Sequence, residues 1–214
     1  MTGKTKPITV LGRTLTFFNQ RCRDWTHPYP YQQDGGNLAN SGCGIFGTCH
    51  AVQWLTGEVP DAEELADFSV QNGGRGDDGT DRPGLLHALS VSGRAARYNF
   101  TYNEDGLRND LDTLYAMLAE ERGVSLCNLR VGHIVCLVAA REHEGRREVL
   151  AIDSYSESAS EKIRDHVREV VPDTEIGWPV RNADGYEVGR SVSYGVFWAD
   201  LDIVRDFNLL WRVK

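Results

Sequence analysis

Cys43 stands between two glycines at the point where an apolar pattern typical of a helix begins. The apolar residues that follow recur at helical spacing: Ile45, Phe46, Cys49, Val52 and Leu55. Gly57 then suits the left-handed position that ends many helices. A thiol at a helix N-terminus is biased toward the thiolate by the positive end of the helix dipole. Cys43 is therefore a candidate nucleophile, and the alternative is that Gly-Cys-Gly is only a turn.

A cysteine nucleophile needs a base that takes up its proton and a third group that orients the base. The segments "HIVCLVAA" and "EVLAIDSY" predict two strands, and the polar loop between them contains Gly145, which favours an antiparallel hairpin. In such a hairpin residue 133 lies across from residues 153–156. We therefore expect His133 and Asp153 side by side, with the carboxylate fixing the imidazole tautomer and supporting the imidazolium that pairs with a thiolate.

The other histidines are weaker candidates for the base. His50 faces roughly the same side of the expected helix as Cys43 but lies about 10 Å further along its axis. The remaining four fall in polar loops or on helical faces, where solvation is the usual role: His27, His87, His143 and His166. Zinc is not expected at Cys43, Cys49 and His50, because the two cysteines differ by about 240° around the helix axis.

The elements that would position these residues are helices first and strands later. Beyond the helix at Cys43, three more helices are predicted in "PDAEELADFSVQNG", where Asp61 can cap, in "TDRPGLLHALSVSG" and in "DGLRNDLDTLYAMLAEERG". The strand "VSLCNL" precedes the hairpin, a helix is predicted in "SASEKIRDHVREVVPD", turns in "GWPVRNADGYEVGRS", and two apolar segments in "YGVFWADL" and "FNLLWRV". This order predicts an α+β fold with an antiparallel sheet and one domain over residues 1–214.

The composition limits the classes of partner and compartment. The 214 residues are 41% hydrophobic, enough for a core, and the formal net charge of -8 favours neither nucleic acid nor an anionic membrane. The five cysteines form no C-x-x-C pair, which favours free thiols in a reducing compartment, with Cys49, Cys127 and Cys136 as core residues. Without a transmembrane run or a signal-peptide pattern, a soluble, cytoplasmic chain is expected, although another secretion route stays open.

The order of several motifs resembles one family. The motifs are "FNQRCRDW", "SGCG" opening a helix that ends "WLTG", "EVPDAEELADF", "GHIVCLVA" and "VLAIDSYS". Over about residues 17 to 155 they resemble the bacteriocin-leader-processing-like (peptidase C39-like) cysteine peptidases of the papain-like superfamily. The resemblance implies a papain-like fold with Cys43 as nucleophile, His133 as general base and acid, Asp153 as the orienting group and Gln20 as an oxyanion donor.

The sequence departs from the family pattern in three places. Ile45 and Phe46 stand where relatives usually have proline or alanine and a small polar residue, and their bulk either narrows the cleft or packs in the core. The segment between Gln20 and Cys43 is long and aromatic, so other amides are alternative oxyanion donors: Asn19, Gln32, Gln33 and Asn37. Residues 157–192 have no clear family counterpart and are expected to be an elaboration or lid.

The activity that the resemblance implies is hydrolysis of a peptide or isopeptide bond through a thiol acyl-enzyme, without a metal or organic cofactor. The expected partner is a peptide or protein substrate, and the oligomeric state is open. The same three side chains would also serve an acyl transferase or a glutamine deamidase, because only the acceptor of the acyl group changes. A further alternative is a catalytically inactive papain-like binding protein, favoured if Ile45 and Phe46 block the pocket.

Overall fold

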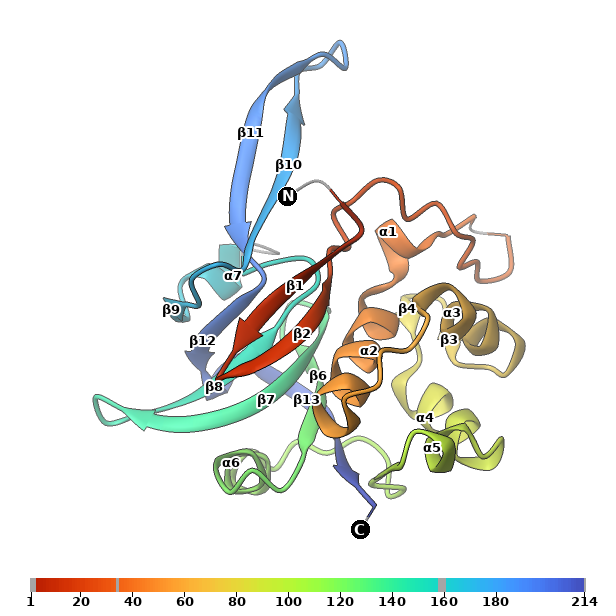
Figure 1. The fold of residues 1–214 in the computed structure, drawn as a ribbon, viewed down its shortest axis with the longest axis vertical. Coiled ribbons are helices and arrows are strands. Elements are labelled where there is room, and N and C mark those ends of the chain that lie inside the picture. Colours follow the sequence, from red (N-terminus) through yellow and green to blue (C-terminus); the bar gives the residue numbers. More distant parts are fainter. Residues whose placement is uncertain (1–2, 34, 158–160, 214) are drawn as a thin grey trace.

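The computed structural model describes residues 3–33, 35–157 and 161–213, with residues 161, 162, 178, 181 and 190 described by their backbone alone (Figure 1). The fold is mixed α+β. Its centre is a seven-stranded sheet in which every neighbouring pair is antiparallel. In spatial order the strands are β5 (Phe100–Tyr102), β13 (Val204–Arg212), β6 (Val124–Leu129), β7 (Ile134–His143), β8 (Arg146–Ile152), β12 (Val196–Asp200) and β9 (Val167–Val170).

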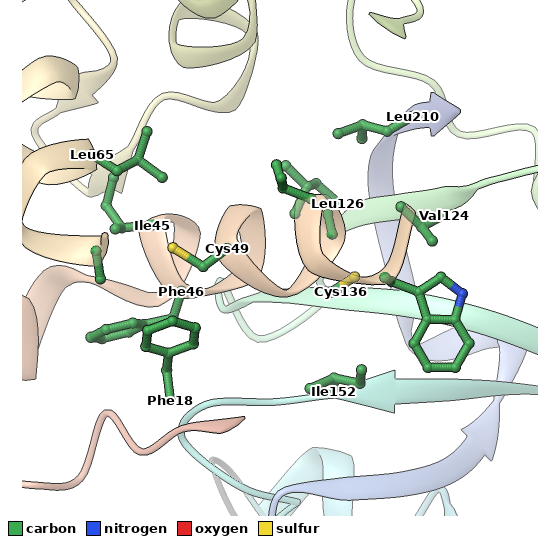
Figure 2. Packing of buried hydrophobic residues seen from close by; sticks show 14 of the residues in the cluster. Phe18, Ile45, Phe46, Cys49, Leu65, Val124, Leu126, Cys136, Ile152 and Leu210 are labelled. Carbon is green, nitrogen blue, oxygen red and sulfur yellow. The ribbon is translucent and has the colours of Figure 1, made fainter. Parts of the chain in front are cut away.

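The two faces of the sheet are covered by different helices. Along β6, Leu126 points to one hydrophobic cluster and Cys127 to the other, and along β8 the neighbours Leu150 and Val149 divide in the same way. This alternation follows from the two-residue period of a strand. The first cluster lies under α2 (Cys43–Thr56), as Figure 2 shows, and the second under α6 (Leu111–Ala119).

Short elements surround these layers. The remaining helices are α1 (Leu38–Ser41), α3 (Ala62–Gln71), α4 (Arg82–Val91), α5 (Arg94–Arg97), α7 (Glu161–Arg164) and the 3-10 turn η1 (Leu201–Ile203). The small two-stranded pairs are β1 (Thr5–Val10) with β2 (Arg13–Phe18), β3 (Arg75–Gly76) with β4 (Gly79–Thr80), and β10 (Glu175–Arg181) with β11 (Glu187–Tyr194). No helix in the described part of the chain is long and apolar enough to cross a membrane.

α2, α3, α4, β6, β7 and β8 lie where the sequence predicts helices and strands, whereas α6 begins only at Leu111, so that Leu107 is exposed ahead of the helix it was expected to join. α2 begins at Cys43 and ends at Gly57, which is left-handed with φ 82°. Asp61 caps α3 by accepting hydrogen bonds from the backbone of Glu63 and Glu64. The expected hairpin is β7–β8, and residues 144 and 145 both have positive φ, as a tight primed turn requires.

Three predictions of secondary structure were wrong or incomplete. The chain opens with the β1–β2 hairpin rather than with helices, because "TKPITV" and "RTLTFF" alternate with the period of a strand around a turn at Leu11 and Gly12. The helix expected from residue 158 until Pro172 is limited to α7, followed by β9, which pairs with β12; residues 158–160 lie outside the described residues.

The third correction concerns residues 177–191, where turns were expected. They belong to the β10–β11 ribbon, and the turn-forming residues of this segment lie at its tip, where Asn182 accepts hydrogen bonds from the backbone of Asp184 and Tyr186. Figure 1 shows the ribbon projecting from the body. Within the expected elaboration of residues 157–192, β9 therefore extends the central sheet, whereas β10 and β11 form a separate two-stranded sheet. The suggested lid role stays a prediction.

Candidate active site

Cys43 is the first residue of α2, directly after the short helix α1. Asn37 and Asn40 cap the start of α1 reciprocally, and Gly42 joins the two helices. A Cβ on Gly42 would lie 2.5 Å from the Leu38 carbonyl oxygen, so the close turn requires glycine. Cys43 is partly exposed and stands where the unpaired N–H groups of the first turn of α2 are concentrated.

The residues after Cys43 pack into the core. Ile45 and Phe46 are fully buried, and the Phe46 ring lies 5.9 Å from that of Phe18 and 4.9 Å from that of Trp25, measured between centroids (Figure 2). On the other side, Gly44 lies so close to Thr80 that a Cβ there would overlap the threonine side chain. Of the two outcomes left open by the sequence, the bulk of Ile45 and Phe46 fills the core rather than narrowing a cleft.

His133 and Asp153 lie at the same end of the central sheet. His133 precedes β7 after Gly132, which has φ 79°, and Asp153 follows β8, held by its N–H donating to the Gly195 carbonyl at 2.7 Å. The His133 Nε2 and Asp153 Oδ1 atoms are 2.7 Å apart. Asp153 is completely buried and His133 nearly so, with 14% of its side chain exposed. The hairpin register thus brings the two side chains together as expected.

The Cys43 thiol and the His133 imidazole lie close enough together that each shifts the pKa of the other. Since Asp153 engages Nε2, the ring leaves Nδ1 for the thiol. Burial favours the neutral thiol, but the hydrogen bond and charge of His133, with the Ile134 N–H, lower the pKa of Cys43 below its ordinary value. Burial also disfavours a charged His133, yet the adjacent Asp153 carboxylate outweighs it and raises the pKa of His133 well above its ordinary value. Both shifts favour the thiolate–imidazolium pair over the neutral thiol and imidazole.

Gln20 lies beside the three residues, and no described contact joins it to Cys43. Its Nε2 donates to the Ala39 carbonyl at 3.4 Å, and its Oε1 accepts from the Ser154 hydroxyl at 3.0 Å. Ala39 is four residues before Cys43, and Ser154 follows Asp153, so the amide lies between the two halves of the site. Its assignment as oxyanion donor stays a prediction.

The alternative oxyanion donors have other surroundings. Asn37 forms the cap of α1, and Asn19 is buried with its side chain bonded to the Gly3 carbonyl and the Arg21 N–H. Gln32 and Gln33 are exposed in the loop before α1. Gln20 is therefore the candidate amide with hydrogen bonds to both the Cys43 and the Asp153 segments.

His50 and the other cysteines have structural surroundings. His50 is buried, its Nε2 accepts the Phe18 N–H at 3.2 Å, and burial lowers its pKa to about 3. Cys22, Cys49, Cys127 and Cys136 are buried, which confirms the core placement expected for the last three. Burial raises the pKa of all four thiols, that of Cys127 to about 12.

Three residues near the site escaped the sequence analysis as participants. The Tyr29 hydroxyl bonds to Ser69 Oγ at 3.0 Å and Thr80 Oγ1 at 2.9 Å, and it lies within the electrostatic influence of Cys43. Tyr155 contacts both His133 and Asp153, and Arg21 in turn contacts Tyr155. Tyr29 and Arg21 reach the site through tertiary packing of distant segments, which no local motif encodes, whereas Tyr155 lies within the stretch 153–156 that the hairpin register already placed across from His133.

A possible cation-binding group lies elsewhere. Within the described ranges, His166, Asp200 and Asp202 form the one group of three potential ligands within 4.8 Å of one another. Arg168 already forms a two-pronged ion pair with Asp200. We therefore assign this group to ion pairing.

Two cavities also lie outside the Cys43 site. The first measures about 260 Å³ and is lined by Arg130, Val131, Ile163, Asp165, His166 and Ile203. Its apolar lining belongs to the cluster on the α6 side of the sheet, whereas α2 covers the other side. The second is lined by Leu111, Arg146, Arg147, Asp200, Leu201 and Asp202. Neither lining includes Cys43, His133 or Asp153.

Comparisons of this chain with models of protein families, with curated proteins and with solved structures find no match.

Proposed function

We propose that this protein is a cysteine peptidase-like hydrolase that cleaves a peptide or isopeptide bond through a thiol acyl-enzyme. The observation that carries the proposal is the chain of contacts from Cys43, at a helix N-terminus, to His133 and on to buried Asp153. A helix that presents the thiol and packs against an antiparallel sheet that supplies the imidazole and carboxylate supports a papain-like architecture, which we propose with it.

The proposed reaction has two steps. The Cys43 thiolate attacks the carbonyl carbon, and the oxyanion accepts hydrogen bonds from the Cys43 N–H and the Gln20 amide. The His133 imidazolium then gives its proton to the leaving nitrogen as the C–N bond breaks. In the second step His133 takes a proton from water, the resulting hydroxide attacks the thioester, and the carboxylic acid leaves as the thiolate re-forms. Asp153 keeps the imidazole oriented throughout.

Gln20 can act as an oxyanion donor if its amide leaves the Ala39 carbonyl when the substrate binds. Its Nε2–Ala39 hydrogen bond is long at 3.4 Å, and bonds of that length are weak. A bound substrate oxygen can therefore compete with the Ala39 carbonyl for the amide. Removing an oxyanion donor costs about 100- to 1000-fold in rate, and Gln20→Ala is expected to lose activity in that range while Asn19→Ala is not.

Two other activities use the same side chains. Acyl transfer differs in that an amine replaces water as acceptor, and deamidation in that a glutamine side chain replaces the peptide bond. A binding protein without catalysis was the third interpretation, on the condition that Ile45 and Phe46 block the pocket. The burial of both residues in the core favours the catalytic interpretation.

The test is incubation of a complex peptide mixture with the protein, followed by mass spectrometry. Hydrolysis creates new peptide termini, transfer joins an added amine, and deamidation converts glutamine to glutamate. We expect new termini that disappear with Cys43→Ala and fall by about 100- to 10,000-fold with His133→Ala. Cys22→Ala, which removes a buried thiol outside the site, is the matched control and should keep the activity. Products that persist in Cys43→Ala would refute the proposal.

A further inference from the structure

Tyr155 touches both partners of the His133–Asp153 pair. Its ring meets the His133 imidazole edge to face, with centroids 5.9 Å apart and planes at 62°. Its backbone N–H donates to Asp153 Oδ1 at 2.7 Å, the same oxygen that binds His133 Nε2. Any movement of Tyr155 therefore reaches the imidazole through its ring face and the carboxylate through a hydrogen bond.

Arg21 in turn holds Tyr155 in two ways. Its guanidinium carbon lies 4.0 Å from the centre of the Tyr155 ring, and its Nε donates to the Tyr155 carbonyl at 2.6 Å. Arg21 follows β2, 134 residues away in sequence. The N-terminal part of the chain thus fixes both the side chain and the backbone of the residue next to the proposed catalytic pair.

The charge of Arg21 also matters to Asp153. Asp153 is fully buried, and its Oδ2 has no hydrogen-bond partner within the described part of the chain. A buried carboxylate needs a nearby positive charge. Burial lowers the pKa of Arg21, while Tyr155, Asp153 and Glu157 are the groups whose charges act on it in the opposite direction. Arg21 is therefore a second source of positive charge for Asp153, besides His133.

We propose that Arg21 and Tyr155 are positioning residues for the Cys43–His133–Asp153 site: they hold the imidazole against Asp153 and help to balance its buried charge. This inference rests on the proposed function but makes its own claim. The two residues act through His133 and Asp153 and do not touch the substrate. Without them the imidazole is held less firmly against Asp153 and supports the thiolate less well, so Cys43 requires a higher pH to become a thiolate.

The test measures the rate of Cys43 alkylation by iodoacetamide against pH in folded variants. Tyr155→Leu and Arg21→Met should shift the midpoint upward by about one pH unit, which slows labelling about tenfold at pH values below both midpoints. Tyr155→Phe keeps the ring and should match the parent. Arg21→Lys keeps the charge without the planar fork and should fall between.

Arg13→Met is the matched control for Arg21→Met. Arg13 lies over the Trp54 ring at 4.7 Å and donates to the Trp54 carbonyl at 3.0 Å, the same pair of contacts far from His133 in the fold. Arg13→Met should lower the thermal unfolding midpoint about as much as Arg21→Met does. It should leave the pH midpoint of Cys43 alkylation unchanged. If the parent has a low pH midpoint for Cys43 alkylation and neither Arg21→Met nor Tyr155→Leu shifts it, this inference alone is overturned. Equal shifts of that midpoint in Tyr155→Phe and Tyr155→Leu would also overturn it. An ordinary thiol profile in the parent would overturn the proposed function as well.

Discussion

His50, within α2, and His133, just before β7, differ in their partners and so in their charge. His133 faces a carboxylate, which raises its pKa well above the ordinary value. His50 faces aromatic rings and a backbone N–H, so burial lowers its pKa to about 3. Nε2 of His50 must accept the Phe18 N–H, which only the neutral ring can do. Helical spacing placed His50 on roughly the same side of the helix as Cys43 but about 10 Å further along its axis, and the partners confirm that His133 is the imidazole suited to form an ion pair.

The residue-scale prediction concerns stability against pH. The unfolded chain protonates residue 50 near pH 6.5 and the folded protein only near pH 3, so this group stabilises the fold above pH 6.5 and loses that contribution as the pH falls. His133 adds no slope there, because a raised folded pKa leaves it protonated in both states below pH 6.5. Because of His50, we expect the unfolding free energy to fall by about 1.4 kcal/mol for each pH unit between pH 6 and pH 5.

Urea denaturation of the parent and His50→Gln across this pH range checks the expectation. His50→Gln is expected to be less stable than the parent at pH 7. Its unfolding free energy should fall less steeply between pH 6 and pH 5, because the contribution of His50 is gone. Equal slopes in both proteins would contradict a neutral buried His50.

At the scale of elements, the start of α2 depends on the contact between Gly44 and the β4 residue Thr80. Gly44→Ala places a Cβ into the Thr80 side chain, whereas Gly47→Ala in the same helix meets first the flexible Leu126 Cδ2 at 3.3 Å. We expect Gly44→Ala to destabilise the protein by about 1–3 kcal/mol, a cost typical of overpacking, and to slow Cys43 alkylation. Gly47→Ala should leave the labelling rate unchanged. Thermal unfolding and the kinetics of Cys43 labelling test both variants. If Gly44→Ala and Gly47→Ala have the same stability and the same labelling rate, the Thr80 contact does not determine the start of α2.

The sequence predicted the elements whose signals are local. The glycine-flanked start of α2 and the β7–β8 turn at Gly145 specify where Cys43, His133 and Asp153 lie along their elements, and the hairpin register brings the last two together. β9 was missed because a four-residue strand without a buried face resembles a helix end in sequence. The β1–β2 hairpin was missed although its two segments alternate with the period of a strand and bury one face in the core. The contacts of Arg21 join segments far apart in sequence, which no local pattern encodes.

At the scale of the whole molecule, the β10–β11 ribbon is attached at its base and projects from the body (Figure 1). Ile176 is buried at the base, and Lys6 donates to the carbonyls of Asp173 and Glu175. Toward the tip Val180, Tyr186 and Val188 are exposed. The outer part of the ribbon therefore adds little to the core.

Shortening the ribbon tests this separation. Residues 180–189 can be replaced by Asn-Gly, because Pro179 and Arg190 are paired across the ribbon. We expect the unfolding free energy to change by less than about 1 kcal/mol, since few buried contacts are lost, and the Cys43 labelling rate to stay the same. Faster labelling in the shortened protein would instead identify the ribbon as a lid over Cys43.

The most direct test of the central claim is the pH dependence of Cys43 alkylation in the parent and in His133→Ala, with the labelled site identified by mass spectrometry. The other four cysteines are buried, so labelling of the folded protein reports on Cys43. The thiolate–imidazolium pair predicts fast labelling well below pH 8.5 that is lost with His133. Slow labelling with an ordinary thiol profile in both proteins would contradict the proposed active site.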